Sequence, residues 1–295
     1  MEKLLKGNEI AEKIKKELKQ KIAQSKIKPG LAIILVGQNK SSNVYVKIKK
    51  QACEEIGINF KLYFFKNIQK NLELEKKILL LIKILNSDSN VHGILVQLPL
   101  PCGLNTTKII KAIDPKKDVD GFHPQNIKKI LSEEKTIMPP VFNAIIKFLK
   151  IIPARILKQK NNALIIGKNK LFAKLLKHLL EKLELNVNIF FYTKNKSQKL
   201  KKISQKADIL IVIVGKSKFI TAEMIKTNSI IIDVGYNFIK NKSTGDVDFE
   251  NIFKKAAFIT PVPGGIGPLT VAFLLKNCYE ATITSVNHKL KFLKN

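Results

Sequence analysis

The chain has 295 residues, of which 45% are hydrophobic, and its formal net charge is +30. This length predicts about two domains with enough residues for a hydrophobic core, and no run of about 18 uncharged apolar residues is present that would span a membrane. The first residues lack the apolar core of a signal peptide, so we expect a cytoplasmic protein.

The positive charge comes almost entirely from lysine. Lysine and arginine total 53 residues, yet Arg155 is the single arginine, and the lysines are spread along all the expected helices. Arginine is favoured in phosphate recognition, because its planar guanidinium can donate two hydrogen bonds to one phosphate. Nucleic-acid sites also gather their basic residues on one face. The charge therefore predicts attraction of polyanionic substrates and argues against nucleic acid as a partner.

Neither the cysteines nor the paired aspartates have the pattern of metal ligands. Cys53, Cys102 and Cys278 lie far apart without metal-ligand spacing, so we expect reduced thiols. Asp118 and Asp120 stand one residue apart before a glycine, but no further cluster of carboxylates or histidines accompanies them. We expect no metal; Asp120 could instead accept hydrogen bonds from the amino and ring N–H groups of a heterocycle.

The first half of the chain alternates helical and extended patterns. We expect helices over residues 8–25, 42–56, 70–86 and 105–113, with strands over residues 31–36, 59–65 and 92–97. Gly57 is expected to end the second helix as its C-cap. The resulting β-α-β-α-β order predicts a parallel sheet with right-handed crossovers.

The second half repeats this pattern. We expect helices over residues 140–152 and 169–183, and strands over residues 163–166, 187–192, 209–214, 230–234 and 258–260. A loop rich in glycine and proline follows over residues 261–270, and a last helix runs to about residue 283. These elements predict a second doubly wound α/β domain.

Candidate catalytic residues lie where the first and third strands end. Tyr45 and Lys49 are four residues apart on a helix, so they share a face, and a phenol beside a primary amine can act as an acid–base pair. Gln97 ends the third strand at the same carboxyl edge, where open α/β folds bind ligands. The spacing alone is equally consistent with a packed tyrosine, a solvated lysine and a glutamine that meets water.

Five segments together resemble the bifunctional methylenetetrahydrofolate dehydrogenase/cyclohydrolase family. They occur in the family's order and cover nearly the whole chain: the helix with Tyr45 and Lys49, and residues 93–101, 117–124, 232–237 and 260–270. The resemblance implies NADP-dependent oxidation of 5,10-methylenetetrahydrofolate and hydrolysis of the methenyl product to 10-formyltetrahydrofolate. It also implies a homodimer that serves one-carbon metabolism and purine biosynthesis and takes folates that can be polyglutamylated.

The resemblance implies a role for each matching residue. Lys49 would be the central catalytic group, Gln97 its hydrogen-bond partner, Tyr45 a catalytic and folate-lining residue, and Asp120 the holder of the pterin. Pro263, Gly264 and Gly265 would also bind substrate. The implied fold is α/β with two domains and a cleft between them. Residues 1–138 with 271–295 would form the parallel α/β catalytic domain, and residues 139–270 the Rossmann-type NADP-binding domain.

The cofactor half departs from the family pattern. Of the glycines in its first turn only Gly167 remains, and Lys168 stands where the family has arginine. We expect the cofactor to contact Gly167, Lys168, Asn169, Thr193, Gly235 and Thr270. No carboxylate follows the second strand of this domain, which favours NADP over NAD. The altered turn leaves open a cyclohydrolase without hydride transfer, and the charge leaves a remote alternative, a protein that binds anions or nucleic acid.

Overall fold

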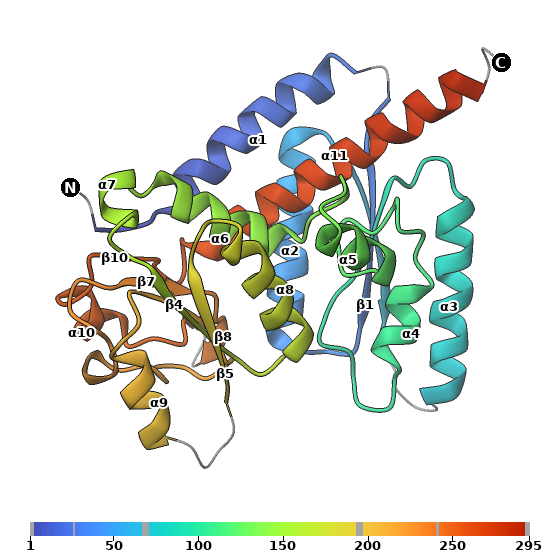
Figure 1. Ribbon diagram of the computed structural model, residues 1–295. Helices are drawn as coiled ribbons and strands as arrows, with labels where there is room; N and C mark the ends of the chain where they lie inside the picture. Colours follow the sequence, from blue (N-terminus) through green and yellow to red (C-terminus); the bar gives the residue numbers. More distant parts are fainter. Residues whose placement is uncertain (1–2, 26, 67–70, 193–196, 240–241, 293–295) are drawn as a thin grey trace. The chain divides into compact units, whose positions relative to one another are not determined.

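The computed structural model describes residues 3–25, 27–66, 71–192, 197–239 and 242–292 (Figure 1). The chain forms two compact units, one made of Ala11–Pro140 with the chain from Val271 onward, the other of the chain up to Ile10 with Val141–Thr270. The first residues thus group with the second unit, whereas we expected them in the first domain. The reason is backbone pairing, because Leu5 N–H donates to Ile259 O at 2.9 Å and Ile259 N–H donates to Lys3 O at 3.0 Å.

The first unit is built on a parallel sheet of three strands in the order β2-β1-β3. These are β1 (Gly30–Val36), β2 (Asn59–Phe65) and β3 (Gly93–Val96). Every residue of β1 is buried, as expected for the central strand of a sheet that is covered on both faces. The order places the end of β3 directly beside the end of β1.

Helices cover both faces of this sheet. They are α2 (Lys40–Ile56), α3 (Asn71–Ser87), α4 (Thr106–Lys111) and α5 (Pro124–Leu131), with most of α1 (Gly7–Ala23) and α11 (Ile266–Phe292). Alternate residues of β1 divide the core. Leu31, Ile33 and Leu35 pack with α1, α2 and α11, whereas Ala32, Ile34 and Val36 pack with α3 and α4.

The second unit carries a parallel sheet of five strands in the order β10-β7-β6-β4-β5. The strands are β4 (Asn162–Gly167), β5 (Asn186–Phe191), β6 (Ile209–Ile213), β7 (Ile230–Asp233) and β10 (Phe258–Ile259). The first strand of this unit, β4, lies between β5 and β6, so the direction of winding reverses there. Ligands of doubly wound sheets bind at the carboxyl end of such a switch point.

Several short elements complete the second unit. They are α6 (Pro140–Ile151), α7 (Ala154–Leu157), α8 (Lys170–Glu181), α9 (Ser197–Ser204), the 3-10 helix η1 (Ala222–Met224), the hairpin strands β8 (Asn237–Ile239) and β9 (Lys242–Thr244), and α10 (Phe249–Phe253). The helix α8 packs against β4 and β5. The core under β4, β6 and β7 is closed by residues of α9 and α10, including Leu200 and Ile252.

The structure corrects both boundaries of the last helix and confirms the end of α2. The expected loop over residues 261–270 is shorter, because α11 already begins at Ile266; Pro268 is tolerated there since amides of the first helical turn have no helical partner. The same helix continues to Phe292, beyond the expected end. Gly57 is confirmed as the C-cap of α2, with a φ of 86° that favours glycine.

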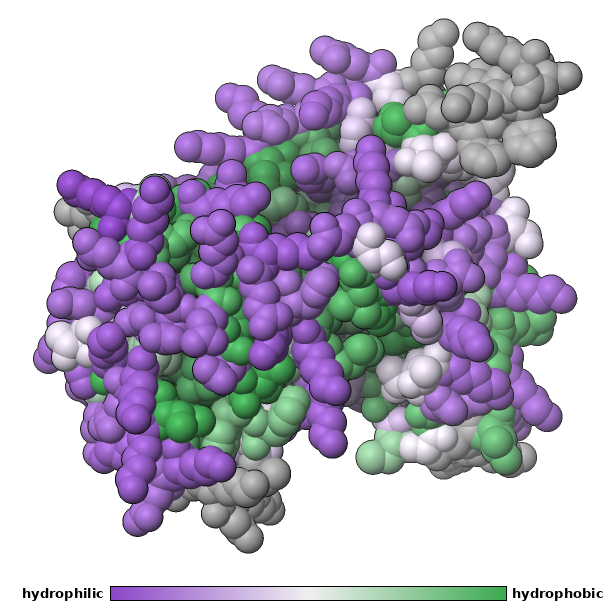
Figure 2. Space-filling model, in the orientation of Figure 1, coloured by the Kyte–Doolittle hydropathy of each residue, from purple (hydrophilic) through white to green (hydrophobic). Residues whose placement is uncertain are grey.

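The surface accords with the even spread of lysine in the sequence. Figure 2 shows hydrophilic residues over elements of both units, with hydrophobic residues visible between them. Among the described helices, none combines the length and the apolar character needed to cross a membrane. Cys53 and Cys278 are buried free thiols, and Cys102 is exposed.

Candidate active site

The centre of the site is a hydrogen bond between Lys49 and Gln97. Lys49 Nζ donates to Gln97 Oε1 at 2.8 Å. The amide of Gln97 is held in this orientation because its Nε2 donates to Leu98 O at 2.9 Å. The expected meeting of these two side chains therefore occurs, and it joins the helix after β1 to the end of β3.

The helix α2 brings Lys49 to this place. Asn39 caps its start, where Asn39 Oδ1 accepts from Ser42 N at 3.0 Å, and Gly57 ends it. Tyr45 lies one turn before Lys49 on the same helix and is half-buried. Both candidate residues thus belong to a rigid helix that is capped at both ends.

Lys49 is almost fully buried, with 7% of its surface exposed. Burial disfavours the charged ammonium and lowers the pKa of Lys49, while the nearby Asp120 and Cys53 act in the opposite direction. The Gln97 oxygen that accepts from its Nζ belongs to a neutral amide and carries no charge to stabilise the ammonium. The arrangement is that of a lysine prepared to accept a proton.

Asp120 is half-buried near this lysine. Burial raises the pKa of Asp120 to about 6, whereas the positive charge of Lys49 lowers it and Asp118 raises it. Among the described residues, none donates a hydrogen bond to the Asp120 carboxylate. Its oxygens are therefore available to a ligand.

The loop that carries Asp120 is fixed by Asp118. The Asp118 carboxylate is buried and accepts from Gly121 N at 3.1 Å, His123 N at 2.7 Å and Asn126 Nδ2 at 3.2 Å. Asn277 Nδ2 on α11 donates to Val119 O at 2.9 Å from the other side. Asp118 is thus engaged in holding its own loop.

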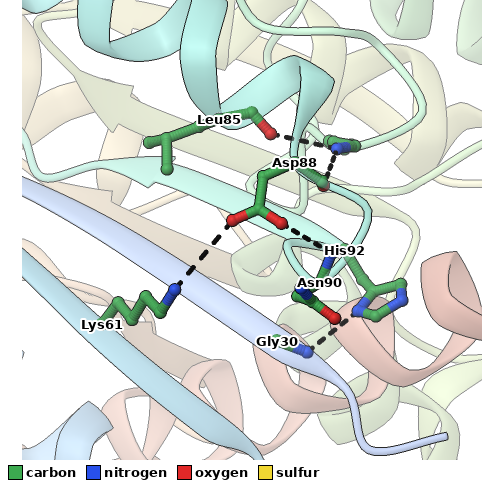
Figure 3. A network of polar contacts seen from close by, with 7 residues as sticks. Gly30, Lys61, Leu85, Asp88, Asn90 and His92 are labelled. Carbon is green, nitrogen blue, oxygen red and sulfur yellow. Dashed lines mark hydrogen bonds and ion pairs between the residues drawn. The ribbon is translucent and has the colours of Figure 1, made fainter.

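Lys117 ties the same loop to the end of α3. Its Nζ donates to the carbonyl oxygens of Leu85, Asn86 and Asp88 at 3.0, 2.7 and 2.8 Å, which are acceptors left open where a helix ends. Figure 3 shows Leu85 and Asp88 in this network, together with His92, whose Nδ1 accepts from Gly30 N at 3.1 Å. A buried histidine and a lysine therefore serve the scaffold.

The proline and glycine segment before α11 belongs to the second unit. Gly264 has a φ of 106°, and its carbonyl oxygen accepts from Gly7 N at 2.7 Å and Asn8 N at 3.2 Å. A Cβ on Gly7 would lie 1.8 Å from Gly265 O, so the backbones approach as only glycine allows. The start of α1 thus holds the segment, a partner that sequence reasoning missed.

The expected cofactor residues divide between the strand ends and the helix starts of the second unit. Gly167 ends β4, and Asn169 caps α8, where Asn169 Oδ1 accepts from Phe172 N at 3.0 Å. Lys168 is exposed between them. Thr270 is in α11, where its Oγ1 donates to Ile266 O at 2.9 Å, and Thr193 lies outside the described residues.

Gly235 adjoins a buried pair of carboxylates that sequence reasoning also missed. A Cβ on Gly235 would lie 2.0 Å from Asp246 Cγ. Asp233 accepts from the amides of Gly235, Asp246 and Val247 at 2.9 to 3.0 Å, and burial raises its pKa to about 7. The glycine is thus required for packing, whatever else it contacts.

Models of one protein family match both halves of the chain. The catalytic domain of tetrahydrofolate dehydrogenase/cyclohydrolase matches residues 5–120, and the NAD(P)-binding domain of the same enzymes matches residues 139–286. The chain belongs to this family. Within the tetrahydrofolate dehydrogenase/cyclohydrolase family, the bifunctional protein FolD of Nitratiruptor sp. is 41% identical over 94% of this chain and 97% of its own length.

Solved structures of the family have the same fold. The FolD enzyme of Campylobacter jejuni is 38% identical, with a TM-score of 0.83 over 95% of this chain and 98% of that chain. The Trypanosoma brucei dehydrogenase-cyclohydrolase, solved with NADP and an inhibitor, is 27% identical with a TM-score of 0.85 over 96% of this chain and 98% of that chain. The two-domain α/β fold expected from the sequence is confirmed.

The second unit has groups that fit NADP. The twelve residues of α8 present a capped amino-terminal end beside Lys168, and a helix start attracts phosphate. The sequence from Asn186 to Lys202 contains no aspartate or glutamate that would repel a 2′-phosphate. Lys168 is a single-point cation without the bidentate fork of an arginine.

Proposed function

We propose that Lys49 is the catalytic base of an NADP-dependent methylenetetrahydrofolate dehydrogenase that also hydrolyses its product. The chain oxidises 5,10-methylenetetrahydrofolate to the methenyl cation and converts the cation to 10-formyltetrahydrofolate. Membership of the family supports both activities. The observation that supports this role is the burial of the Lys49 side chain, which lowers its pKa. Its Nζ also donates a hydrogen bond to the neutral amide of Gln97.

The hydrolytic step uses Lys49 in its neutral form. The water oxygen bonds to the methenyl carbon while one water proton passes to Lys49 Nζ. The bond from that carbon to N5 then breaks, N5 takes a proton from Lys49, and the carbinol proton leaves to solvent. Gln97 orients Nζ through its fixed amide oxygen. A positioned general base of this kind contributes about 10²–10⁴-fold.

The oxidative step places different demands on the same residues. NADP, when bound, accepts the hydride of the methylene carbon. The carbon becomes cationic as the hydride leaves, so a neutral Lys49 avoids the repulsion that a charged ammonium would cause. Tyr45, one turn away on α2, is proposed to line the folate site and to assist the acid–base chemistry.

Substrate binding is proposed to rest on Asp120 and the segment before α11. The Asp120 carboxylate, which accepts no hydrogen bond from the described residues, would suit the amino and ring N–H groups of a pterin. Pro263, Gly264 and Gly265 are proposed to contact the folate through their backbone, which their packing against Gly7 keeps in one conformation.

Cofactor binding is proposed at Gly167, Lys168, Asn169, Thr193, Gly235 and Thr270. The helix start at α8 and the exposed Lys168 support this set. A cyclohydrolase without hydride transfer is less favoured, because the NAD(P)-binding domain matches over its whole sheet and its first turn keeps a cation. A primary role in nucleic-acid binding is not favoured either, since the family match covers both halves.

A homodimer is proposed to form through β2. This strand is an edge of its sheet and exposes Leu62 and Phe64, at 44% and 47% of their surface. An edge strand with exposed apolar side chains invites pairing with another strand. Phe64→Lys should shift sedimentation to the monomer, whereas Ile239→Lys, equally exposed at 47% in the other unit, should not. A monomeric wild-type chain would contradict this proposal.

The remaining features stay predictions. The resemblance predicts a catalytic domain at residues 1–138 with 271–295, apart from the first ten residues, which group with the other unit. It also predicts a cofactor domain at residues 139–270, supply of purine biosynthesis and acceptance of polyglutamylated folates, whereas the amino-terminal sequence predicts a cytoplasmic location.

The testing experiment follows the nicotinamide and methenyl absorbances together while purified protein acts on 5,10-methylenetetrahydrofolate and NADP. We expect reduction of NADP by the wild type and loss of turnover in Lys49→Met. Hydrolysis of supplied methenyltetrahydrofolate that depends on Lys49, without reduction of NADP or NAD, would instead establish a cyclohydrolase alone.

A further inference from the structure

Asn277 is a buried side chain on α11 that bonds two distant segments of the first unit. Only 4% of its surface is exposed, and its Nδ2 donates to Val119 O and to Met138 O, both at 2.9 Å. A side-chain amide has two N–H groups, so both donors of Asn277 are used on main-chain carbonyls. Val119 directly precedes Asp120. One side chain therefore connects the turn that carries Asp120 with the segment 137–139.

The bond to Val119 fixes one of the two peptide planes that meet at Asp120. Because the peptide bond is planar, the carbonyl oxygen of Val119 and the Cα of Asp120 lie in one plane. The next plane is fixed by Asp118, since Gly121 N donates to Asp118 O at 3.2 Å and to Asp118 Oδ1 at 3.1 Å. With both planes fixed, the freedom that remains to Asp120 is that of its side-chain torsions.

The bond to Met138 supports the same turn from its other end. A Cβ on Gly121 would lie 2.7 Å from Pro139 N, and its φ of 75° favours glycine. The backbone of the turn therefore lies directly against the segment 137–139. Because Pro139 has no N–H to donate, the segment is held there through an acceptor, the Met138 carbonyl, and the donor is Asn277.

The turn shares its support with the pair formed by Lys49 and Gln97. Ile94 N on β3 donates to Lys117 O at 2.7 Å, which joins the turn to the strand. The same strand leads directly into Gln97, whose oxygen accepts from Lys49. The backbone of Asp120 is therefore fixed relative to Lys49, so a ligand held by Asp120 would be presented to the amine in a set position.

We propose that Asn277 is a positioning residue that holds Asp120 in the orientation that binds the folate ring beside Lys49. This inference rests on the proposed function and deepens it, because it names a residue outside the binding contacts that determines folate affinity. The Asp120 carboxylate accepts no hydrogen bond from the described residues, so its direction depends on the backbone that Asn277 holds.

The test measures KM and kcat for hydrolysis of supplied methenyltetrahydrofolate by the full chain, a reaction that needs no NADP. The variants are Asn277→Leu, which has no donor, and Asn277→Ser, which keeps one hydroxyl donor. Thr282→Val is the matched control, because Thr282 is also buried on α11 and its Oγ1 donates to Cys278 O at 2.8 Å. Thermal melting verifies that each variant is folded, and Asn277→Ser decides the question if Asn277→Leu does not fold.

We expect Asn277→Leu to raise KM about 10-fold, near the lower value for a hydrogen bond to a charged group, and Asn277→Ser to raise it about 3-fold. The value of kcat should stay within about twofold, because Lys49 and Gln97 keep their own hydrogen bonds and a loss of uniform binding raises KM alone. Thr282→Val should change KM less than about twofold, since its bond is not made to the turn.

A double-mutant cycle with Asp120→Ala separates positioning from a general loss of structure. If Asn277 acts through Asp120, Asn277→Leu should raise KM less than about twofold further once the carboxylate is gone. A general loosening of the first unit would instead raise KM by the same factor in both backgrounds.

The inference is overturned if both variants of Asn277 keep KM within about twofold of Thr282→Val, or if Asn277→Leu raises KM equally with and without the Asp120 carboxylate. In either case hydrolysis by the wild type that depends on Lys49 would leave the proposed function intact. A wild-type chain that does not hydrolyse methenyltetrahydrofolate would overturn both the inference and the cyclohydrolase activity.

Discussion

Replacement of Lys49 by methionine tests the catalytic proposal most directly. Methionine has a similar length and keeps the packing of the lysine stem, but it cannot accept a proton. If Lys49 is the general base, hydrolysis of methenyltetrahydrofolate should fall by about 10²–10⁴-fold, which corresponds to roughly 3–5 kcal/mol of barrier.

The variant should remain folded. Loss of the buried ammonium removes its desolvation cost, while Gln97 Oε1 loses its donor, which costs about 1–3 kcal/mol. Gln97 still donates to Leu98 O, so the amide stays in place. Because these effects oppose each other, we expect only a small change in the free energy of unfolding, measured by chemical denaturation.

The assay is the decay of the methenyl absorbance at several pH values, with Lys50→Met as the control. Lys50 is exposed on the same helix and pairs with Glu54 at 3.7 Å. Only the neutral amine accepts a proton, so wild-type hydrolysis should rise with pH through the lowered pKa of Lys49. A folded Lys49→Met protein that hydrolyses within about threefold of Lys50→Met would refute the reasoning.

Three further predictions address other residues, two of them in the first unit with Lys49 and one in the second unit. Asp120→Asn should raise KM for the folate about 10–100-fold, and wild-type folate affinity should fall below about pH 6 as Asp120 is protonated, a loss absent in the variant when KM is measured against pH. Gln97→Glu places a carboxylate beside Lys49 and stabilises its charged form, so the rise of hydrolysis should move to higher pH by roughly one unit; an unmoved profile would count against the contact. Gly245→Ala places a Cβ 1.9 Å from a buried carboxylate oxygen and should cost more than about 3 kcal/mol of unfolding free energy. Gly215→Ala meets no atom within 4 Å but has a φ of 67°, and should cost only about 1 kcal/mol, as denaturant titration would show.

The order of elements could be predicted because the central strands are unbroken apolar runs. Residues 31–36 and 209–213 are buried throughout or nearly so, which is the pattern of parallel strands covered on both faces. The periodicity was less informative near helix ends. Leu72 matches the apolar face of its helix, but it is 80% exposed because it is the second residue of α3, where the helix has not yet reached the core.

The contacts of the site depend on sheet order, which the sequence does not specify. Lys49 and Gln97 meet because β3 lies beside β1 in the sheet. The spacing of residues along the chain does not indicate which strands are neighbours. Asp118 resembles Asp120 in the sequence, yet its oxygens are taken by the amides of its own turn. Asn277, which steadies the same turn, comes from 158 residues away.

The single carboxylate of Asp246 has a consequence for how this protein can change. It specifies the path of Val214, Gly215 and Lys216 from a distant part of the chain, through their amides alone. The shape of the loop therefore depends little on its own side chains. Substitutions of these side chains should therefore leave the path of the backbone unchanged, so this loop can vary in sequence while it keeps its shape.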